Sequence, residues 1–358
     1  MQQAPFIFFC RPGFESDCAA EVQAIATAHD LAGYANAQPE TGYVRYYMFD
    51  QSSAEEFFGL LDLVDIIFAR QWFWAKAELE DMPLDDRISP IIDICSELSS
   101  AKNVLVEHLD SGDGRELSKF CKKFSTPLTI SLEKQNLIQE EGEFRLHVLF
   151  LANDHCLIGL SPLECSSPHK GGILRLKAPK DAPSRSTLKL DEGIQVLISR
   201  KQQKDAFRLG NTGVDLGAAP GGWTYQLVER GLQVSAIDNG PMDKKLMATE
   251  HVEHFKENAF TWLPKKPVNV LVCDMVEKPS LVANLMAEWL EGSHTQHAIF
   301  NLKLPMKKRF QEVADCIGLI CERLEDADLD YFWQAKHLYH DREEVTVYFR
   351  LKTRVTPN

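Results

Sequence analysis

A glycine-rich turn is the first place in this 358-residue sequence where residue type and spacing indicate chemistry. Residues 214–223 read VDLGAAPGGW; they follow a strand-like run and precede a helix-like one, where open α/β sheets bind ligands. Gly217 allows a sharp exit from the strand, and Gly221 and Gly222 let a bound molecule approach the backbone because glycine has no Cβ. Asp238 ends the next strand-like run, where a carboxylate can accept hydrogen bonds from both ribose hydroxyls. Turn and acid together predict a nucleoside cofactor.

The turn departs from the G-x-G-x-x-G pattern of NAD-binding proteins. Pro220 stands where such a turn offers a backbone amide to a pyrophosphate, so a nucleoside cofactor without phosphate fits better. S-adenosylmethionine is such a cofactor, and Rossmann-like methyltransferases bind it at this turn. A tight strand-to-helix connection without a ligand is the alternative, and the acid at Asp238 weighs against it.

The segment DLGAAPGGW resembles the cofactor loop of the FtsJ-type RNA ribose 2'-O-methyltransferases, and the likeness spans roughly residues 184–350. That superfamily carries a Lys-Asp-Lys-Glu tetrad. Matching residues occur here in the same order, namely Lys189 in SRSTLKLDE, Asp274 in VLVCDM, Lys303 in FNLKLP and Glu344 in REEVTVY. Glu343 is the adjacent alternative for the glutamate. The resemblance implies an α/β fold with a Rossmann-like domain that uses S-adenosylmethionine.

The resemblance also implies which residues contact the cofactor. They are Ser186, Asp215, Gly217, Ala219, Pro220, Gly221, Gly222, Trp223, Asp238, Asn258 and Asp274. Asn258 stands where relatives usually carry an aspartate facing the adenine, and its side-chain carbonyl can accept a hydrogen bond from the amino group of the base. No HExxH motif or clustered Cys/His spacing occurs, so we expect no metal site.

The whole chain, including RPGFESDCAAE and SPHKGGILRLKAP, resembles the bacterial enzymes that methylate a cytidine ribose in 23S rRNA. The N-terminal half of that family contains a THUMP RNA-binding region. The resemblance implies free or incompletely assembled 23S rRNA as partner, with a target near the peptidyl-transferase centre in domain V. We expect a monomer that binds neither DNA nor membranes.

Methyl transfer to a ribose 2'-hydroxyl needs a base beside a poor nucleophile. Lys303 is our candidate base, and Lys189 supplies a second positive charge nearby. A free lysine has a pKa of about 10.4, so a basic lysine must be desolvated or lie beside another cation. Asp274 and Glu344 would orient the two ammonium groups, although carboxylates also favour the charged lysine.

Other classes of methyl-transfer reaction have weaker support in the sequence. Amino-methylating enzymes usually carry a D/N-P-P-Y/F motif where this chain has CDMV. A pyrimidine C5 enzyme needs a nucleophilic cysteine, and side-chain alternation points Cys273 away from Asp274, which favours a buried structural thiol. A non-catalytic RNA-binding assembly factor that retains the fold stays open as an alternative.

Regular alternation of strand-like and helix-like runs after residue 186 would bring these residues to one edge of a sheet. We expect helix 186–207, strand 212–217, helix 223–230, strand 233–238, strand 268–275, helix 280–291, strand 297–304 and helix 307–324. This alternation predicts a doubly wound parallel sheet with helices on both faces. Two later runs, 331–339 and 345–351, are close enough to pair as an antiparallel edge.

The N-terminal half predicts two α+β parts. The expected elements are strand 6–10, helix 18–29, strand 43–48, a helix from Ser53, strand 63–74, helix 88–99, strand 103–108, helix 116–124 and strands 144–151 and 155–161. We therefore expect four segments: a ferredoxin-like subdomain over 1–55, a THUMP-like RNA-binding domain over 56–165, a basic linker over 166–185 and the methyltransferase domain over 186–358.

Composition excludes disorder, collagen and coiled coil, since 44% of residues are hydrophobic and 25% are charged. The formal net charge of −13 by itself argues against a phosphate-rich partner. Locally, residues 171–210 carry nine basic and four acidic side chains. We expect RNA phosphates to contact the basic residues flanking the tetrad, which are Lys170, Arg175, Lys177, Lys180, Arg185, Lys307, Lys308 and Arg309.

Cysteine usage and the N-terminal sequence indicate the compartment. Nine cysteines form no C-x-x-C pair, which fits reduced thiols in a cytoplasmic protein. The first ten residues lack the basic region of a signal peptide, and no run approaches the roughly 18 apolar residues of a membrane span.

Overall fold

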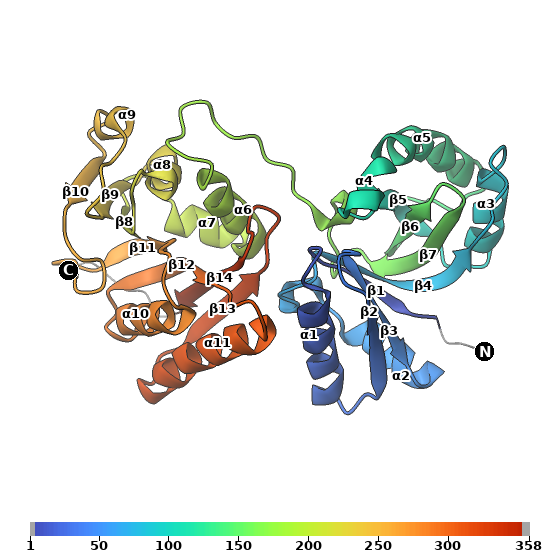
Figure 1. The fold of residues 1–358 in the computed structure, drawn as a ribbon, viewed down its shortest axis with the longest axis horizontal. Coiled ribbons are helices and arrows are strands. Elements are labelled where there is room, and N and C mark those ends of the chain that lie inside the picture. Colours follow the sequence, from blue (N-terminus) through green and yellow to red (C-terminus); the bar gives the residue numbers. More distant parts are fainter. Residues whose placement is uncertain (1–3, 353–358) are drawn as a thin grey trace. The chain divides into compact units, whose positions relative to one another are not determined.

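The computed structural model describes residues 4–352, and the chain divides into two compact units, Met1–Leu174 and Arg175–Asn358 (Figure 1). Residues 1–3 and 353–358, the outer ends of the predicted domains, lie outside the described residues. Within the described part, no helix is long and apolar enough to cross a membrane.

The first unit is built on one seven-stranded sheet, the N-terminal sheet, with strand order β2-β3-β1-β4-β7-β6-β5. Its strands are β1 (Phe6–Phe9), β2 (Gly33–Ala37), β3 (Tyr43–Met48), β4 (Gln71–Leu79), β5 (Ala101–His108), β6 (Phe144–Ala152) and β7 (His155–Pro162). Strand β4 pairs antiparallel with both β1 and β7, so the two predicted α+β parts share a continuous sheet. Neighbouring strands are antiparallel except β5 and β6.

Helices cover this sheet in two groups. They are α1 (Glu15–Ala28), α2 (Gln51–Leu60), α3 (Ile88–Ser96), α4 (Gly112–Glu116) and α5 (Ser118–Lys134). Helix α1 packs against β2 and β3, whereas α5 packs against β5 and α3 against β4 and β7. Apolar side chains of α3, α5 and strands β5–β7 form one core, with Ile91, Leu128 and Val148 fully buried.

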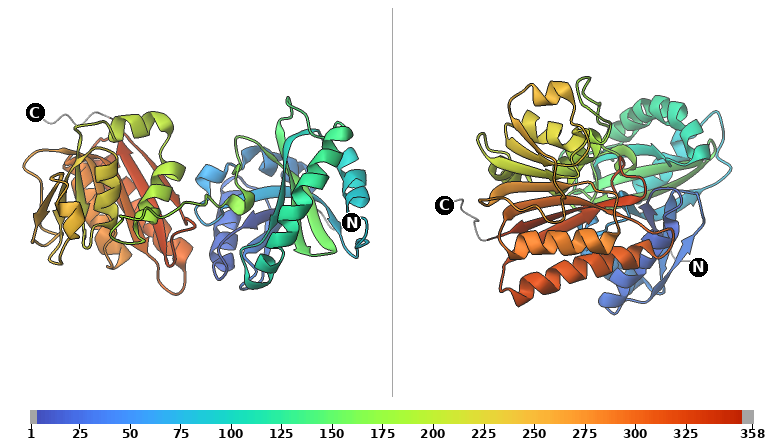
Figure 2. Two further views of the ribbon diagram at one scale, coloured as in Figure 1. Left: turned by 90° about the horizontal axis from the view of Figure 1, so that it is seen from above. Right: turned by 60° about the vertical axis from the view of Figure 1, so that its left-hand side comes forward.

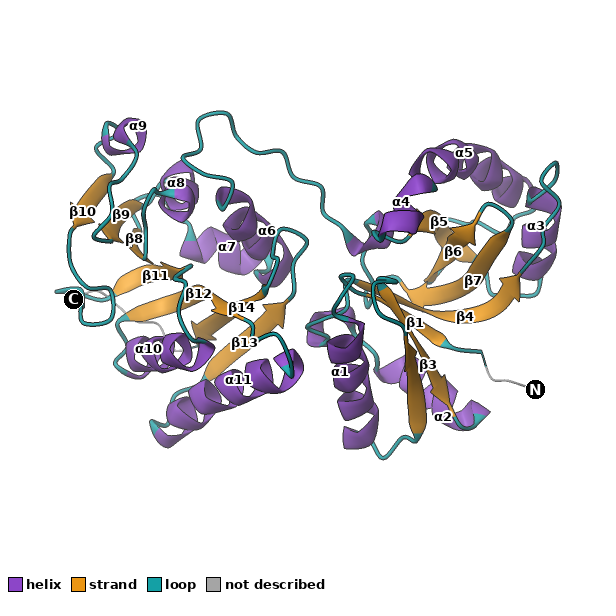
Figure 3. Cartoon of the chain, in the orientation of Figure 1, coloured by secondary structure: helices purple, strands orange, loops and turns teal. Residues whose placement is uncertain are grey.

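The first part of the predicted linker is bound to the N-terminal sheet. Gln71 donates its side-chain N–H to the carbonyl of Ser167 at 2.7 Å. The Glu107 carboxylate accepts the backbone N–H of Gly171 at 2.7 Å, within the short 3₁₀ helix η2 (Lys170–Gly172). Figure 3 shows loop between η2 and the next helix. The unit boundary at Leu174 and Arg175 follows this bound segment directly.

The second unit contains another seven-stranded sheet, the C-terminal sheet, with strand order β10-β9-β8-β11-β12-β14-β13. Its strands are β8 (Thr212–Leu216), β9 (Gln233–Ile237), β10 (Val252–Phe255), β11 (Val268–Cys273), β12 (Thr295–Lys303), β13 (Tyr331–Lys336) and β14 (Glu344–Leu351). The first five are parallel, and β14 runs antiparallel to both β12 and β13. This confirms the predicted doubly wound sheet with its antiparallel pair.

Helices lie on both faces of the C-terminal sheet, as the right-hand view of Figure 2 shows. They are α6 (Thr187–Leu197), α7 (Arg200–Ala206), α8 (Gly222–Glu229), α9 (Lys244–Met247), α10 (Pro279–Glu291) and α11 (Arg309–Asp326). Helices α6 and α8 contact each other and pack on one face through Leu190, Trp223 and Leu227. Helices α10 and α11 lie together on the other (Figure 1).

Three predicted elements are wrong in extent. The predicted helix 116–124 is too short, since α5 extends over Ser118–Lys134. The predicted helix 186–207 is two helices, because Ile198 is extended and Ser199 caps α7 in a capping box with Gln202. The predicted strand 63–74 begins instead as a 3₁₀ turn, Leu63–Asp65, because the Asp62 side chain accepts the N–H of Val64. The short strands β2 and β10 are not among the predicted elements.

Candidate active site

The glycine-rich turn leaves β8 and enters α8 with two residues in the left-handed region. Gly217 has φ +78° and Gly221 has φ +116°, conformations that favour glycine. A Cβ on Gly217 would overlap the side chain of Met275, and one on Gly221 would overlap Leu246. The Ala219–Pro220 peptide is cis. The chain thus needs glycine at both positions to hold this open turn.

Asp238 lies at the turn, as the sequence predicts. Its Oδ2 accepts the N–H of Ala219 at 3.0 Å and its Oδ1 accepts the N–H of Gly240 at 2.6 Å. The residue is half-buried, so it is not sealed from solvent. A half-buried carboxylate beside a Cβ-free turn fits a ribose with its two hydroxyls.

Other predicted cofactor residues support the turn from behind. Trp223 is buried in the core, and its indole N–H donates to the carbonyl of Ser186 at 3.1 Å. Asp215 is buried and accepts the hydroxyl of Thr224 at 2.6 Å. These contacts join α6, α8 and β8.

Burial raises the pKa of Asp215 to about 7, although the hydrogen bond from Thr224 acts in the opposite direction. Ser186 precedes α6, and its hydroxyl lies against Gly222. Asn258 is exposed after β10, where its Oδ1 accepts the N–H of Phe260 at 3.0 Å.

Strand register brings three tetrad residues to the same edge as the turn. Asp274 directly follows β11, whose last residue, Cys273, pairs with Leu216 at the end of β8. Lys303 ends β12 and lies opposite Glu344, the first residue of β14. Parallel strands present their carboxyl ends together, and the antiparallel β14 presents its start there. The edge therefore collects Asp274, Lys303 and Glu344.

Lys189 completes the group from α6. Its Nζ lies 3.5 Å from Oδ2 of Asp274 and also pairs with Oε1 of Glu344. The Nζ of Lys303 lies 2.6 Å from Oδ1 of Asp274 and 3.8 Å from Oε2 of Glu344. The four side chains are between 8% and 20% exposed, so the alternating charges are shielded but reachable.

The surroundings of Lys189 keep it protonated. Burial lowers the pKa of this lysine, but Asp274 and Glu344 outweigh burial, so the pKa lies above its usual value. Glu343, the alternative glutamate, is exposed and pairs with Arg309 at 3.3 Å, away from both lysines. Geometry thus distinguishes the two neighbouring glutamates.

A further residue, Glu192, holds the loop before β14. It is buried on α6, three residues after Lys189, and its Oε1 accepts the N–H of Tyr339 at 2.9 Å. Its Oε2 accepts the N–H of His340 at 2.9 Å. The sequence does not predict a role for Glu192. The only indication is its position three residues after Lys189 on a predicted helix, which places both side chains on one side of that helix.

Predicted RNA-binding residues border this loop at two points. The Arg175 guanidinium lies over the ring of Tyr339, 5.8 Å from its centroid, and Arg309 contacts Glu343. Lys177, Lys180, Arg185, Lys307 and Lys308 are exposed within the second unit. Lys170 belongs to the first unit, where its Nζ donates to the hydroxyl of Ser125 at 3.2 Å.

A cavity of about 1410 Å³ opens at the opposite edge of the C-terminal sheet. It is lined by the first residues of parallel strands, including Thr212, Gln233, Val252 and Val268. The tetrad and the glycine-rich turn do not line it. Ligands of doubly wound sheets bind at the carboxyl ends of the strands, so this cavity is separate from the candidate site.

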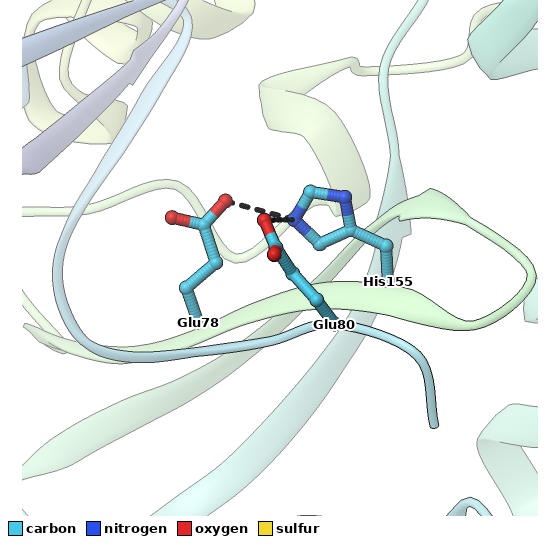
Figure 4. A group of neighbouring side chains, drawn as sticks. All are labelled: Glu78, Glu80 and His155. Carbon is cyan, nitrogen blue, oxygen red and sulfur yellow. Dashed lines mark hydrogen bonds and ion pairs between the residues drawn. The ribbon is translucent and has the colours of Figure 1, made fainter. Parts of the chain in front are cut away.

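One group of residues among 4–352 has ligand atoms close enough to share a metal ion, namely Glu78, Glu80 and His155 (Figure 4). Nε2 of His155 lies 2.8 Å from Glu78 and 3.8 Å from Glu80. The Arg45 guanidinium donates to both oxygens of Glu78, at 2.8 and 2.7 Å. Because a cation already holds the Glu78 carboxylate, we assign the group as an ion-pair network of the N-terminal sheet.

Comparison with known proteins gives the class of the site. The sequence model of the FtsJ-like methyltransferase family matches residues 182–308, so the second unit is a methyltransferase domain. The model for the RlmM ferredoxin-like domain matches residues 1–73, and that for the N-terminal region of ribosomal RNA large subunit methyltransferase M matches residues 86–162.

Two full-length relatives carry the name ribosomal RNA large subunit methyltransferase M. The protein from Pseudoalteromonas translucida (strain TAC 125) is 48% identical over 349 residues, which cover 96% of each chain. The protein from Aliivibrio fischeri (strain MJ11) is 44% identical over 359 residues, covering 98% of this chain and 100% of the relative. The chain belongs to the ribosomal RNA large subunit methyltransferase M family, and S-adenosylmethionine is its cofactor.

Proposed function

We propose that this protein methylates the 2'-oxygen of a cytidine ribose in 23S rRNA, near the peptidyl-transferase centre in domain V. The observation that carries the proposal is the contact of Lys189 and Lys303 with Asp274 at the edge that holds the glycine-rich turn. The sequence contains no D/N-P-P-Y/F motif, which amino-methylating enzymes usually carry. The family assignment supports rRNA of the large subunit as the substrate.

S-adenosylmethionine, when bound, supplies the methyl group. Asp238 would hold its ribose through its carboxylate, beside the turn that Gly217 and Gly221 shape. Asn258 would contact the adenine from the loop after β10. Trp223 and Asp215 would act indirectly, because both side chains are buried beneath the turn.

Lys303 acts as the base in this proposal. Its Nζ takes the proton that the ribose 2'-hydroxyl gives up as the oxygen bonds to the methyl group, and the resulting ammonium is held by Asp274. Lys189 is the poorer base because its raised pKa keeps it charged. Its ammonium and the Glu344 carboxylate would keep Lys303 and the ribose oxygen aligned.

The basic residues of the second unit would lead rRNA to the site. Arg175 and Arg309 both touch the segment that ends at Glu344, so phosphates bound there would lie beside the tetrad. We also propose that residues 1–55 and the THUMP-like 56–165 add RNA contacts, with 166–185 as the basic linker. The protein would act as a cytoplasmic monomer on free or incompletely assembled rRNA.

The test is methyl transfer from labelled S-adenosylmethionine to protein-free 23S rRNA, assembled subunits and a DNA copy. We expect label on one cytidine of protein-free rRNA, mapped by resistance of the adjacent bond to alkaline cleavage, and its loss in Lys303→Ala. Label on a base instead of a ribose would overturn the 2'-O assignment. Binding of cofactor and rRNA without transfer to any substrate would favour the assembly-factor alternative.

A further inference from the structure

A line of buried side chains extends from Asp274 away from the solvent-facing side of the tetrad. Nδ2 of Asn301 donates to Oδ1 of Asp274 at 2.9 Å. The Oγ1 of Thr346 lies 2.8 Å from Oδ1 of Asn301, and it lies 3.2 and 3.0 Å from the two carboxylate oxygens of Asp341. Asn301, Thr346 and Asp341 are all 0% exposed.

Strand register explains why this line lies directly behind the tetrad. Asn301 pairs with Thr346 between β12 and β14, and Lys303 pairs with Glu344 two residues further along the strands. Side chains two residues apart on a strand share a face. Asn301 and Thr346 therefore lie next to Lys303 and Glu344 on the same face of the sheet, and Asp341 from the loop before β14 lies beside Thr346.

The direction of each hydrogen bond follows from the chemistry of the groups. The Asp274 carboxylate lies against the Nζ of both lysines and is therefore an acceptor, so Asn301 must turn its amide N–H toward it. The carbonyl of Asn301 then faces Thr346, whose single hydroxyl proton it accepts. The Asn301 oxygen lies nearest to the Thr346 hydroxyl, at 2.8 Å against 3.0 and 3.2 Å for the Asp341 oxygens, so it takes the single hydroxyl proton. A hydrogen bond between Thr346 and Asp341 then needs a proton on the Asp341 carboxyl.

The surroundings of Asp341 favour the protonated acid. Glu344, Glu192 and the ammonium of Lys189 are charged groups that interact with it, and the loop N–H of Leu338 donates to its Oδ2 at 3.1 Å. Burial is the largest effect on the pKa of Asp341 and the two carboxylates act in the same direction, whereas the hydrogen bonds with Leu338 and Thr346 act in the opposite one; the pKa lies well above the usual aspartate value.

We propose that Asp341 is held as the neutral acid and, through Thr346 and Asn301, positions Asp274 between the two lysines. This inference rests on the proposed function, because it assigns Asp274 to the methyl-transfer tetrad. The three residues are positioning residues, since they act only through Asp274.

The first test uses shape-matched variants of Thr346 in the full-length protein. Thr346→Val removes the hydroxyl and keeps the volume, and Thr346→Ser keeps the hydroxyl. We expect Thr346→Val to lower kcat by about tenfold with KM for rRNA and Kd for S-adenosylmethionine within twofold, because one hydrogen bond to the charged network is lost. Thr346→Ser should stay within about twofold of wild type. Thermal unfolding of both variants checks that the fold is intact.

The role of Asp341 is tested by comparing a conservative substitution with a truncation to alanine. Asparagine can donate an amide N–H to Thr346 and accept from Leu338, so Asp341→Asn should recover most of the kcat that Asp341→Ala loses. The difference infrared spectrum between wild type and Asp341→Asn at neutral pH should show the C=O stretch of one protonated carboxylic acid. Absence of that band, or equal loss of kcat in Asp341→Asn and Asp341→Ala, would overturn the proposal.

The infrared measurement also separates this inference from the proposed function. If wild type transfers no methyl to rRNA ribose, the proposed function fails, while the acid band still decides whether Asp341 is protonated. If wild type is active and Thr346→Val matches it in kcat, the positioning role fails and the proposed function stands.

Discussion

Lys303 and Glu344 lie opposite each other in the register of β12 and β14, with Nζ of Lys303 3.8 Å from Oε2 of Glu344. The pairing depends on β14 running antiparallel between β12 and β13. A parallel strand would have brought its last residues, instead of its first, to the edge that carries the glycine-rich turn. Because β14 is antiparallel, its first residue, Glu344, lies at the edge where the neighbouring parallel strands have their carboxyl ends.

Cofactor binding and methyl transfer should separate in two variants. Asp238→Asn leaves the fold but weakens the carboxylate contacts with the cofactor ribose, so we expect Kd for S-adenosylmethionine to rise by about tenfold. Lys303→Met keeps the length of the side chain without a base, so cofactor Kd should stay within twofold while transfer falls below detection. Calorimetry and a methyl-transfer assay measure the two quantities. A large loss of cofactor affinity in Lys303→Met would contradict this division of roles.

RNA affinity should depend on the exposed basic residues of the second unit. Lys177→Gln with Lys180→Gln should weaken rRNA binding and lower the slope of log affinity against log salt by roughly 1.4, about 0.7 for each contact to single-stranded RNA. The matched control is Lys265→Gln with Lys266→Gln, two exposed lysines that line the cavity at the opposite sheet edge. Filter binding at several salt concentrations measures the slope. Equal slopes for both double variants would remove Lys177 and Lys180 from the RNA path.

The bound start of the linker should depend on Gly172. This residue has φ +67°, and a Cβ there would overlap the backbone carbonyl of Arg70. We expect Gly172→Ala to destabilise the first unit by about 2 kcal/mol or more, because strain and overlap add. Gly59→Ala is the control, since its Cβ would meet nothing within 4 Å on α2 and helix propensity favours alanine. Urea unfolding followed by tryptophan fluorescence should show opposite signs for the two variants.

Asp215 should make the second unit less stable as pH rises. Its folded pKa of about 7 lies above the unfolded value of 3.8, so the unfolded state binds fewer protons between these values and stability falls across that window. Asp215→Asn removes the free-energy cost of ionising a buried carboxyl group, and the asparagine can still accept a hydrogen bond from the hydroxyl of Thr224. We expect the variant to gain up to about 4 kcal/mol at pH 8 and much less near pH 4.5.

Urea unfolding at the two pH values measures this gain. Asp30→Asn, an exposed substitution, is the control and should change the free energy of unfolding by no more than about 0.5 kcal/mol. A constant offset between Asp215→Asn and wild type at both pH values would show that Asp215 is ionised in the folded protein.

His297 should destabilise the fold in acid. Burial lowers the pKa of this imidazole to about 4, and its Nδ1 lies 2.8 Å from the hydroxyl of Tyr348. The unfolded state therefore binds the extra proton between pH 6.5 and 4, and stability falls as pH drops through that range. His297→Gln should be less stable than wild type at pH 7, and the gap should narrow by up to about 3 kcal/mol at pH 4. Urea unfolding at both pH values measures the gap, and His29→Gln, on the surface, is the control that should change the free energy of unfolding by no more than about 0.5 kcal/mol.

Several features could be predicted from local sequence. Glycines at 217 and 221 indicated an open turn because few other residues adopt positive φ, and Asp238 could be placed beside it because parallel strands end together. The regular spacing of strands and helices after residue 186 predicted the doubly wound sheet. The break at Ile198 escaped prediction because a helical apolar pattern continues through it, and the Ser199 capping box prevails locally.

The sequence by itself determined the class of the site, since the turn, the acid at 238 and four ordered charges depend on residue types and their order. Only the tertiary structure decided between Glu343 and Glu344, because strand register turns one toward Lys189 and leaves the other on the surface with Arg309. Only the structure brought Asp341 and Thr346 behind Asp274, since these contacts join residues from different strands. Hydrogen-bond direction and burial are properties of packed neighbours, and a linear pattern does not contain them.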